Sequence, residues 1–215
     1  MLWVWERRSD LRDLPPAVGV AFLGSTVLLR SGAVQTVPRL QPLLLSPGVF
    51  RMVVIRIEAA PVAMQLTVTQ RGKTVETITE TLRITRADAV QVDFDARLSE
   101  RPFYRALLND LRAKLGPYRF LSITALASWC GADSWLDGLP VDEVVPMTFE
   151  MGPAAGATET LIQSGGDFNY PKCTGSIGIS TRELAARPRK HQRTYVFSYE
   201  DWTSSKVNKV LAKLP

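Results

Sequence analysis

The sequence predicts an α/β protein folded as a compact (β/α)8 barrel of TIM type with abbreviated helices. Eight short apolar segments follow one another, and most are continuously hydrophobic, as strands of a parallel sheet buried on both faces are. A chain of 215 residues lies near the short end for such barrels. We therefore expect a single domain over residues 1–215 in which several helices are shortened. The predicted strands are residues 2–5, 18–23, 52–57, 90–94, 121–126, 144–149, 176–179 and 195–197.

Two helices are clearly marked, at residues 100–114 and 204–214. In the first, Ser99 is the predicted N-cap, and Phe103, Leu107 and Leu111 share one face. The order of strand, acidic strand end and helix is how such barrels build a corner of an active site.

Other connections are less sharply defined. Weaker patterns allow helices at residues 73–84, 135–139 and 157–163, although the Thr-rich alternation over 74–81 would also suit a strand. The Pro- and Leu-rich segment 28–49 predicts an irregular crossover in place of the second helix. An open doubly wound sheet is the alternative fold, but no Gly-rich phosphate loop follows the first strand.

Composition narrows the classes of partner and cofactor. The net charge is +5, but Lys and Arg are scattered apart from a short run at 187–193, so no nucleic acid is expected. No apolar run reaches the roughly 18 residues that cross a bilayer, so no transmembrane segment is expected. His191 is the only histidine, which argues against a metal site, and we expect no cofactor. The N-terminus lacks a signal-peptide pattern, so the protein is cytoplasmic, or it is periplasmic or envelope-associated with a targeting segment missing from this chain.

The most informative stretch is the strand over residues 90–94 and the turn after it. Gln91, Asp93 and Asp95 alternate with apolar residues and so share one face, which is the interior of the barrel. Ionised carboxylates are costly to bury, so this strand end has partners for them or chemistry to do. Asp95, nearer the strand end, is the better catalytic candidate.

The remaining strand ends also carry acids and aromatic residues, a combination typical of carbohydrate sites, where rings stack on sugars and paired acids transfer protons. The predicted catalytic residues are Asp95, Asp93, Glu58 and Glu6, and the predicted binding residues are Trp129, Tyr199, Trp5 and Arg56.

Each candidate has a structural alternative. Asp93 could form an internal salt bridge with Arg56 on the neighbouring strand, and Glu58 could pair with Arg56 or Arg97. Asp95 could orient the turn through backbone N–H groups. Trp129 could plug the core beneath a loop, and Tyr199 could be a packing residue.

Cys130 and Cys173 are the only cysteines. A bridge between them would close a loop of roughly forty residues and contribute roughly 4 kcal/mol in the chain-entropy model. If it forms, the chain works in an oxidising compartment; otherwise these are two buried thiols. We favour the bridge.

Three blocks of the sequence carry a family resemblance. VQVDFDARLSERPFYRALLNDLR, LSITALASWCGADSWLDGLPVDEVVPMTFEMG and GGDFNYPKCTGSIGIST together resemble a bacterial family defined only as a domain of unknown function. The resemblance covers nearly the whole chain, but it implies no reaction, because none is assigned to that family. Some members carry export or lipoprotein signals, which fits a bridge between Cys130 and Cys173.

More distantly, the fourth strand is similar to that of chitinase-like glycoside hydrolases, in which an Asp-x-Asp-x-Glu run ends in the proton donor. The three positions fall on Gln91, Asp93 and Asp95, so the first acid is replaced by an amide and the donor is one bond shorter. The resemblance implies a glycoside-hydrolase-like barrel acting on an envelope or extracellular glycan. The alternative is a non-catalytic carbohydrate-binding or envelope scaffold protein.

Overall fold

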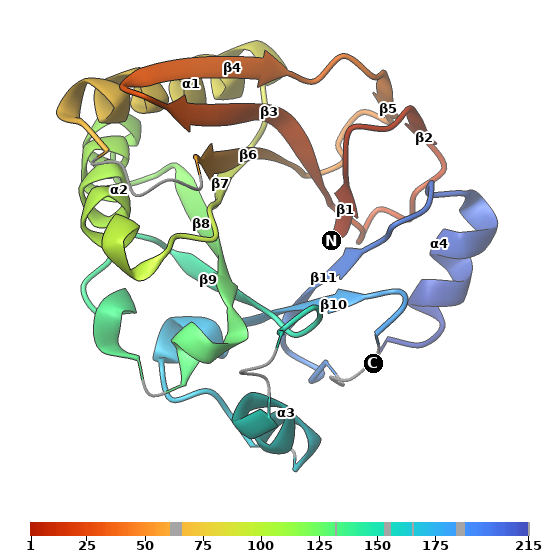
Figure 1. Cartoon of the computed structure of the whole chain (residues 1–215). Coiled ribbons are helices and arrows are strands. Elements are labelled where there is room, and N and C mark those ends of the chain that lie inside the picture. Colours follow the sequence, from red (N-terminus) through yellow and green to blue (C-terminus); the bar gives the residue numbers. More distant parts are fainter. Residues whose placement is uncertain (61–65, 132, 153–155, 165, 184–187, 215) are drawn as a thin grey trace.

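In a computed structural model of the chain, which describes residues 1–60, 66–131, 133–152, 156–164, 166–183 and 188–214, parallel strands close into a barrel (Figure 1). This confirms the predicted fold class. The barrel closes because β1 pairs in parallel with both β3 and β11. In order around the barrel, its strands are β1 (Leu2–Val4), β3 (Val20–Arg30), β6 (Arg51–Ala59), β7 (Ala89–Asp93), β8 (Phe120–Leu126), β9 (Glu143–Met147), β10 (Ser176–Ser180) and β11 (Arg193–Phe197).

The segment predicted as an irregular crossover is partly regular. β3 continues to Arg30 and turns back as β4 (Ala33–Pro38), with which it pairs antiparallel. Ser31 and Gly32 both have positive φ (38° and 79°), which suits a two-residue hairpin turn. Further along, β5 (Leu43–Leu45) pairs with β2 (Ser9–Leu11). The prediction of an irregular crossover in place of a helix was therefore wrong in part: no helix lies in the described residues 28–49, but strands β4 and β5 do.

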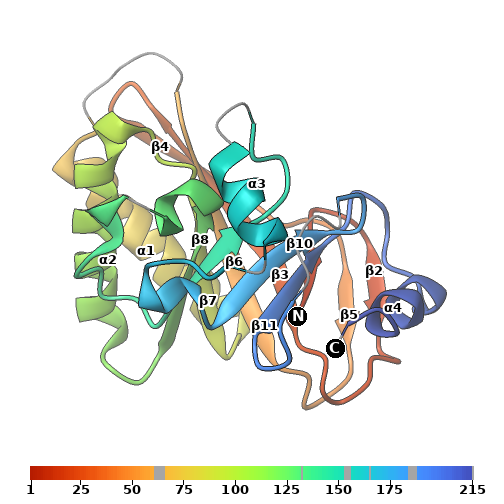
Figure 2. The ribbon, with the colours of Figure 1, turned by 90° about the horizontal axis from the view of Figure 1, so that it is seen from below.

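Two long helices lie outside the barrel on one side (Figures 1 and 2). α1 (Val68–Thr85) lies between β6 and β7, so the Thr-rich stretch is helical; its N-cap Thr67 forms a capping box with Gln70. α2 (Arg101–Leu115) follows β7 after the 3₁₀ turn η1 (Leu98–Glu100). Ser99 lies inside that turn and is not the N-cap.

The other helices around the barrel are shorter. α3 (Gly156–Gln163) and α4 (Ser204–Leu211) lie where helices were predicted, whereas the predicted helix at 135–139 is reduced to the 3₁₀ turn η3 (Ser134–Leu136). Figures 1 and 2 show α1 and α2 together on one side of the barrel and α4 on the other.

A disulfide joins Cys130, at the end of the 3₁₀ turn η2 (Ala127–Cys130), to Cys173 in the turn η5 (Pro171–Cys173). Both turns pack against β9. The predicted bridge thus fastens short turns over a strand that lacks a long helix beside it.

The interior of the barrel contains both apolar and polar layers. One apolar cluster fills it, made of Trp3, Ala21, Met52, Val54, Ala89, Val145, Tyr195 and Phe197. Beside it, the Gln91 amide donates to Ser122 (2.8 Å), and Ser122 and Tyr195 both donate to Glu143 (2.7 and 2.6 Å). These hydrogen bonds link strands β7, β8, β9 and β11 to one another, while the Gln91 Oε1 is buried without a partner among the described residues.

Candidate active site

Asp93 is the last residue of β7, and its side chain points into the barrel, where it is only 3% exposed. Its neighbour in the strand register is Arg56 on β6. The Arg56 guanidinium donates to one carboxylate oxygen (2.9 Å), and the Thr124 hydroxyl on β8 donates to the other (2.7 Å). The predicted internal salt bridge is therefore present, and the buried carboxylate has a partner on each oxygen.

Asp95 lies two residues further along, beyond the strand, and its side chain is 47% exposed. Its nearest positive charge is Nη2 of Arg56, at 3.9 Å. Partial burial and, to a smaller extent, the charge of Asp93 raise the pKa of Asp95 to about 6, although Arg56 acts in the opposite direction. At mildly acidic pH this carboxyl group holds a proton and is accessible, which are the two properties of a proton donor.

Arg56 connects a third carboxylate to this pair. Its Nε donates to Glu58, also on β6, at 3.0 Å. One guanidinium contacts both Glu58 (3.0 Å) and Asp95 (3.9 Å), so these two carboxylates lie on either side of the same cation. Arg97, the other expected partner of Glu58, instead pairs with Glu100.

A second feature of the site is a row of aromatic rings. Trp5 contacts Trp3 (ring centroids 5.5 Å apart), Trp3 stacks on Phe197 (4.4 Å), and Phe197 contacts Phe149 (4.7 Å). The ends of the row, Trp5 and Phe149, are half-buried, and Arg56 lies over the Trp5 ring at 5.7 Å. The row therefore begins beside the acids. Phe149 and Phe197 were not among the predicted binding residues, although both lie at strand ends.

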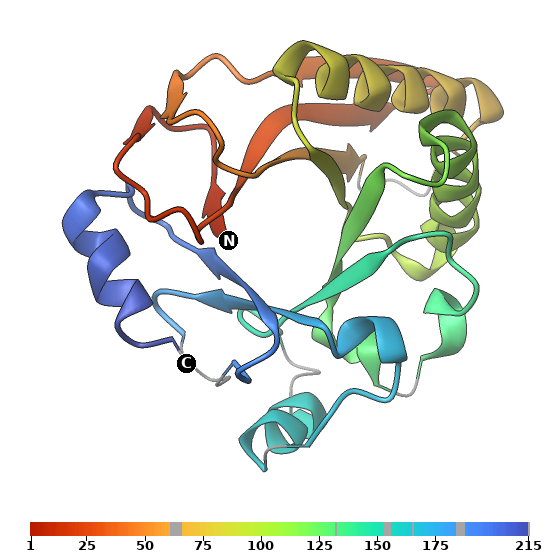
Figure 3. The ribbon, with the colours of Figure 1, turned by 180° about the vertical axis from the view of Figure 1, so that it is seen from behind.

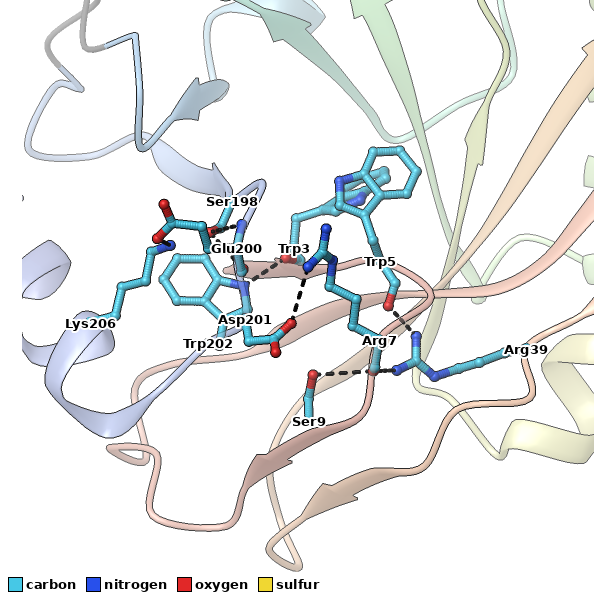
Figure 4. Close-up of polar contacts among 10 residues, drawn as sticks. All are labelled: Trp3, Trp5, Arg7, Ser9, Arg39, Ser198, Glu200, Asp201, Trp202 and Lys206. Atoms are coloured by element: carbon cyan, nitrogen blue, oxygen red, sulfur yellow. Dashed lines mark hydrogen bonds and ion pairs between the residues drawn. The ribbon is translucent and has the colours of Figure 1, made fainter.

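Glu6 belongs to a different set of contacts. Its carboxylate accepts the backbone N–H groups of Leu40 (2.9 Å) and Gln41 (2.8 Å), while Arg39 donates to the carbonyls of Trp5 (2.5 Å) and Arg7. Figure 4 shows Arg39 reaching these two carbonyls, with Arg7 paired to Asp201 and Trp202 bonded to the Trp3 carbonyl. Glu6 thus fastens the loop after β4 to the loop after β1, and Glu58 is the acid placed with Asp93 and Asp95.

Trp129 is 3% exposed and packs edge-on against Trp135, with ring centroids 4.8 Å apart. Arg101 lies over both rings. The expectation of a stacking platform was wrong, because neither face of the indole is open to a sugar; Trp129 is the core plug that the alternative described.

Tyr199 follows β11 and is half-buried, with Arg182 over its ring at 4.6 Å. Partial burial, together with the neighbouring Glu150 carboxylate, raises the pKa of the phenol to about 12. Its predicted role in binding stays a prediction.

Within the described residues, no group of three or more His, Cys, Asp or Glu side chains is arranged to hold a metal ion. No helix in that part of the chain is both long and apolar enough to span a membrane.

The closed ring of eight parallel strands defines a (β/α)8 barrel of TIM type, with acidic residues at the end of β7. No family model and no curated protein matches the chain. Among solved structures, it is similar to a "Family GH18 Chitinase from Chromobacterium violaceum" (12% identity, TM-score 0.52, 92% of this chain and 78% of that one). It is also similar to a "putative Chitinase A from Streptomyces coelicolor" (12% identity, TM-score 0.54, 99% of this chain and 94% of that one).

A third structure, the chitinase domain of the spore coat protein CotE from Clostridium difficile, matches at 13% identity and a TM-score of 0.45. There, 68% of this chain is covered, and the chain spans 49% of that one. At such identities the likeness establishes the fold alone. The two structures with TM-scores of 0.52 and 0.54 support the distant resemblance to the fold of chitinase-like barrels. The resemblance to the domain-of-unknown-function family stays a prediction.

Proposed function

We propose that this barrel hydrolyses an envelope or extracellular glycan, with Asp95 as the proton donor. The observation that carries the proposal is the contrast between two acids on one strand end: Asp93 is buried and doubly hydrogen-bonded, whereas Asp95 is accessible with a raised pKa of about 6. An accessible acid whose surroundings raise its pKa, next to a second carboxylate, is typical of acid–base sites.

In this mechanism the Asp95 carboxylic acid gives its proton to the glycosidic oxygen while the bond from that oxygen to the anomeric carbon breaks. Water adds to the anomeric carbon, and Glu58 accepts the proton that this water loses. The ionised form of Asp93 would stabilise the positive charge that develops on the sugar ring, and Arg56 and Thr124 hold it in place.

Binding of the sugar uses the half-buried rings at the two ends of the aromatic row. Trp5 and Phe149 offer apolar faces for the sugar ring, and Arg56 offers donors for hydroxyl groups. The Cys130–Cys173 disulfide supports a place of action outside the reducing cytoplasm.

The direct test is Asp95→Asn. The native protein is incubated with chitin oligosaccharides and a panel of bacterial envelope glycans, and new reducing ends are measured. We expect Asp95→Asn to lower turnover at least about 100-fold, the typical contribution of a general acid, with little change in melting temperature. Asp13→Asn, at an exposed loop position, is the matched control and should be fully active. Full activity of Asp95→Asn would exclude Asp95 as the donor.

A second candidate function is glycan binding without turnover, as a carbohydrate-binding or envelope scaffold protein. It is favoured by the contacts of Arg56, whose guanidinium touches all three carboxylates and partly neutralises them. The same glycan panel separates the two functions. Binding without product release, equally strong in Asp95→Asn, would support the scaffold.

A further inference from the structure

A basic groove lies at the end of the barrel opposite the acids, between the C-terminal ends of α1 and α2. Its volume is about 540 Å³, and it is lined on the α1 side by Arg83 and Arg86 and on the α2 side by Lys114 and Arg119. Arg86 comes shortly before β7 and Arg119 directly before β8, so the groove opens where these strands begin. Figure 3 shows the two helices side by side. We call this surface, together with Arg51, the basic groove.

Positive charge in the basic groove exceeds negative charge. Arg51 joins the four lining cations, since its guanidinium donates to the Arg86 carbonyl (3.1 Å). Two carboxylates oppose these five cations: Glu80 pairs with Arg83, and Asp88 accepts the backbone N–H of Arg51 (2.8 Å). Within the residues that the structure describes, no ion pair involves Arg86, Lys114 or Arg119.

Arg86 occupies a strained backbone position. It is the C-cap of α1 with φ of 50°, in the left-handed region that most often holds Gly at helix ends. Compensation of the helix dipoles accounts for basic residues in the last turns of α1 and α2. Arg51 donates to the carbonyl of Arg86, and Arg119 donates to the carbonyls of Ala87 and Asp88, so these two cations are held at the groove by backbone contacts. Arg86 itself carries a long cation at a backbone position where glycine would cost less.

Exposed apolar side chains flank the basic groove. Tyr118, in the loop before β8, is 98% exposed, and Ile84, in the last turn of α1, is 64% exposed. A tyrosine ring beside clustered Lys and Arg suits the boundary of a bilayer, where the ring enters the headgroup region and the cations meet phosphate. A soluble polyanion would use the cations but not these side chains.

We propose that the basic groove, with Tyr118 and Ile84, docks the barrel on a bilayer that carries anionic phospholipids. Docked in this way, the barrel holds Asp95 and Trp5 at the end away from the lipid. The proposal does not depend on the glycan-hydrolysis proposal, because it uses none of the same residues.

The test is sedimentation of the full chain with vesicles of phosphatidylglycerol and phosphatidylcholine, compared with vesicles of phosphatidylcholine alone. We expect binding only to the anionic vesicles, and loss of binding as salt rises and screens the charges. Each cation removed should weaken partitioning about fivefold, so Arg86→Gly with Lys114→Gln should weaken it about 25-fold. Lys73→Gln, at the other end of α1, is the matched control and should bind as the native chain does.

Arg86→Gly also separates binding from folding. It should melt at the same or a higher temperature, because glycine relieves the strained backbone, and yet bind vesicles less well. Tyr118→Ser should weaken binding to anionic vesicles and leave binding to soluble polyphosphate unchanged. Absence of binding to anionic vesicles at low salt would overturn the proposal. The proposal would also be overturned if Lys73→Gln weakened vesicle binding as much as the groove variants do. It would equally be overturned if the chain bound polyphosphate and Tyr118→Ser left vesicle binding unchanged.

Discussion

Asp93 and Asp95 are two residues apart, yet their surroundings give them opposite properties. Asp93 has a donor on each oxygen, whereas Asp95 is 3.9 Å from its nearest cation and next to a like charge. The folded state therefore binds the proton of Asp95 more tightly than an unfolded chain does, since its pKa rises from 3.8 to about 6.

This difference predicts how stability depends on pH. The contribution of Asp95 is complete below about pH 3.8 and is lost as pH rises through about 6. Asp95→Asn cannot ionise, so its melting temperature relative to the native chain should increase between pH 4 and pH 7.5. Because Asp95 is half exposed, solvent screening keeps the effect below about 1 kcal/mol. Thermal melts at both pH values measure it, and an unchanged or reversed difference would contradict the raised pKa.

Alternation along β7 was enough to place Asp93 inside the barrel, because side-chain direction in a strand has a period of two. Its pairing with Arg56 was an open alternative in the sequence, and the register of β6 with β7 decides for it. The positions of Trp129 and Glu6 were not predictable in the same way. The burial of Trp129 depends on Trp135 and Arg101 closing over it, and the contacts of Glu6 depend on a loop more than thirty residues away in sequence. Local pattern carries no information about such contacts.

At the scale of elements, the pairing of β6 with β7 is the central feature of the site. Arg56 and Asp93 are register partners, so the strand pair and the ion pair form together. Removing one partner of a buried ion pair leaves an uncompensated charge, which typically costs 3–5 kcal/mol.

We therefore expect Arg56→Met to lower the free energy of unfolding by about 3 kcal/mol at pH 7, the lower end of that range, because Arg56 is partly exposed. Adding Asp93→Asn should restore part of the loss, since the unpaired buried carboxylate at this position is then removed. Urea unfolding of the native chain and of both variants measures these differences. A single variant as stable as the native chain, or a double variant less stable than the single one, would refute the assignment.

Some helices and strands could be predicted from the sequence better than others. The helical alternative for α1 is correct because the capping box at Thr67 and the spacing of Val75, Ile78 and Leu82 agree. The β3–β4 hairpin was missed because its turn, Ser31 and Gly32, lies in a segment whose Pro and Leu content indicates irregular chain.

At the scale of the whole molecule, the barrel has a complete ring of strands and an incomplete ring of helices. Eight runs of apolar residues were sufficient to predict the ring of strands, since parallel strands buried on both faces have few other arrangements. Between β8 and β9 the described cover consists of short 3₁₀ turns, and one of these, η2, is bridged to η5. The disulfide is therefore expected to supply stability that helix packing supplies elsewhere.

Cys130 and Cys173 are 43 residues apart, and a loop of that length corresponds to roughly 4 kcal/mol in the chain-entropy model. Replacing both cysteines by Ala should lower the free energy of unfolding by about that amount, as should reduction of the native chain with dithiothreitol. The reductant should leave the double variant unaffected, which distinguishes loss of the bridge from general damage. Denaturant unfolding under oxidising and reducing conditions measures all four states. If the native chain were equally stable in both conditions, packing of η2 and η5 on β9 would be sufficient without the covalent link.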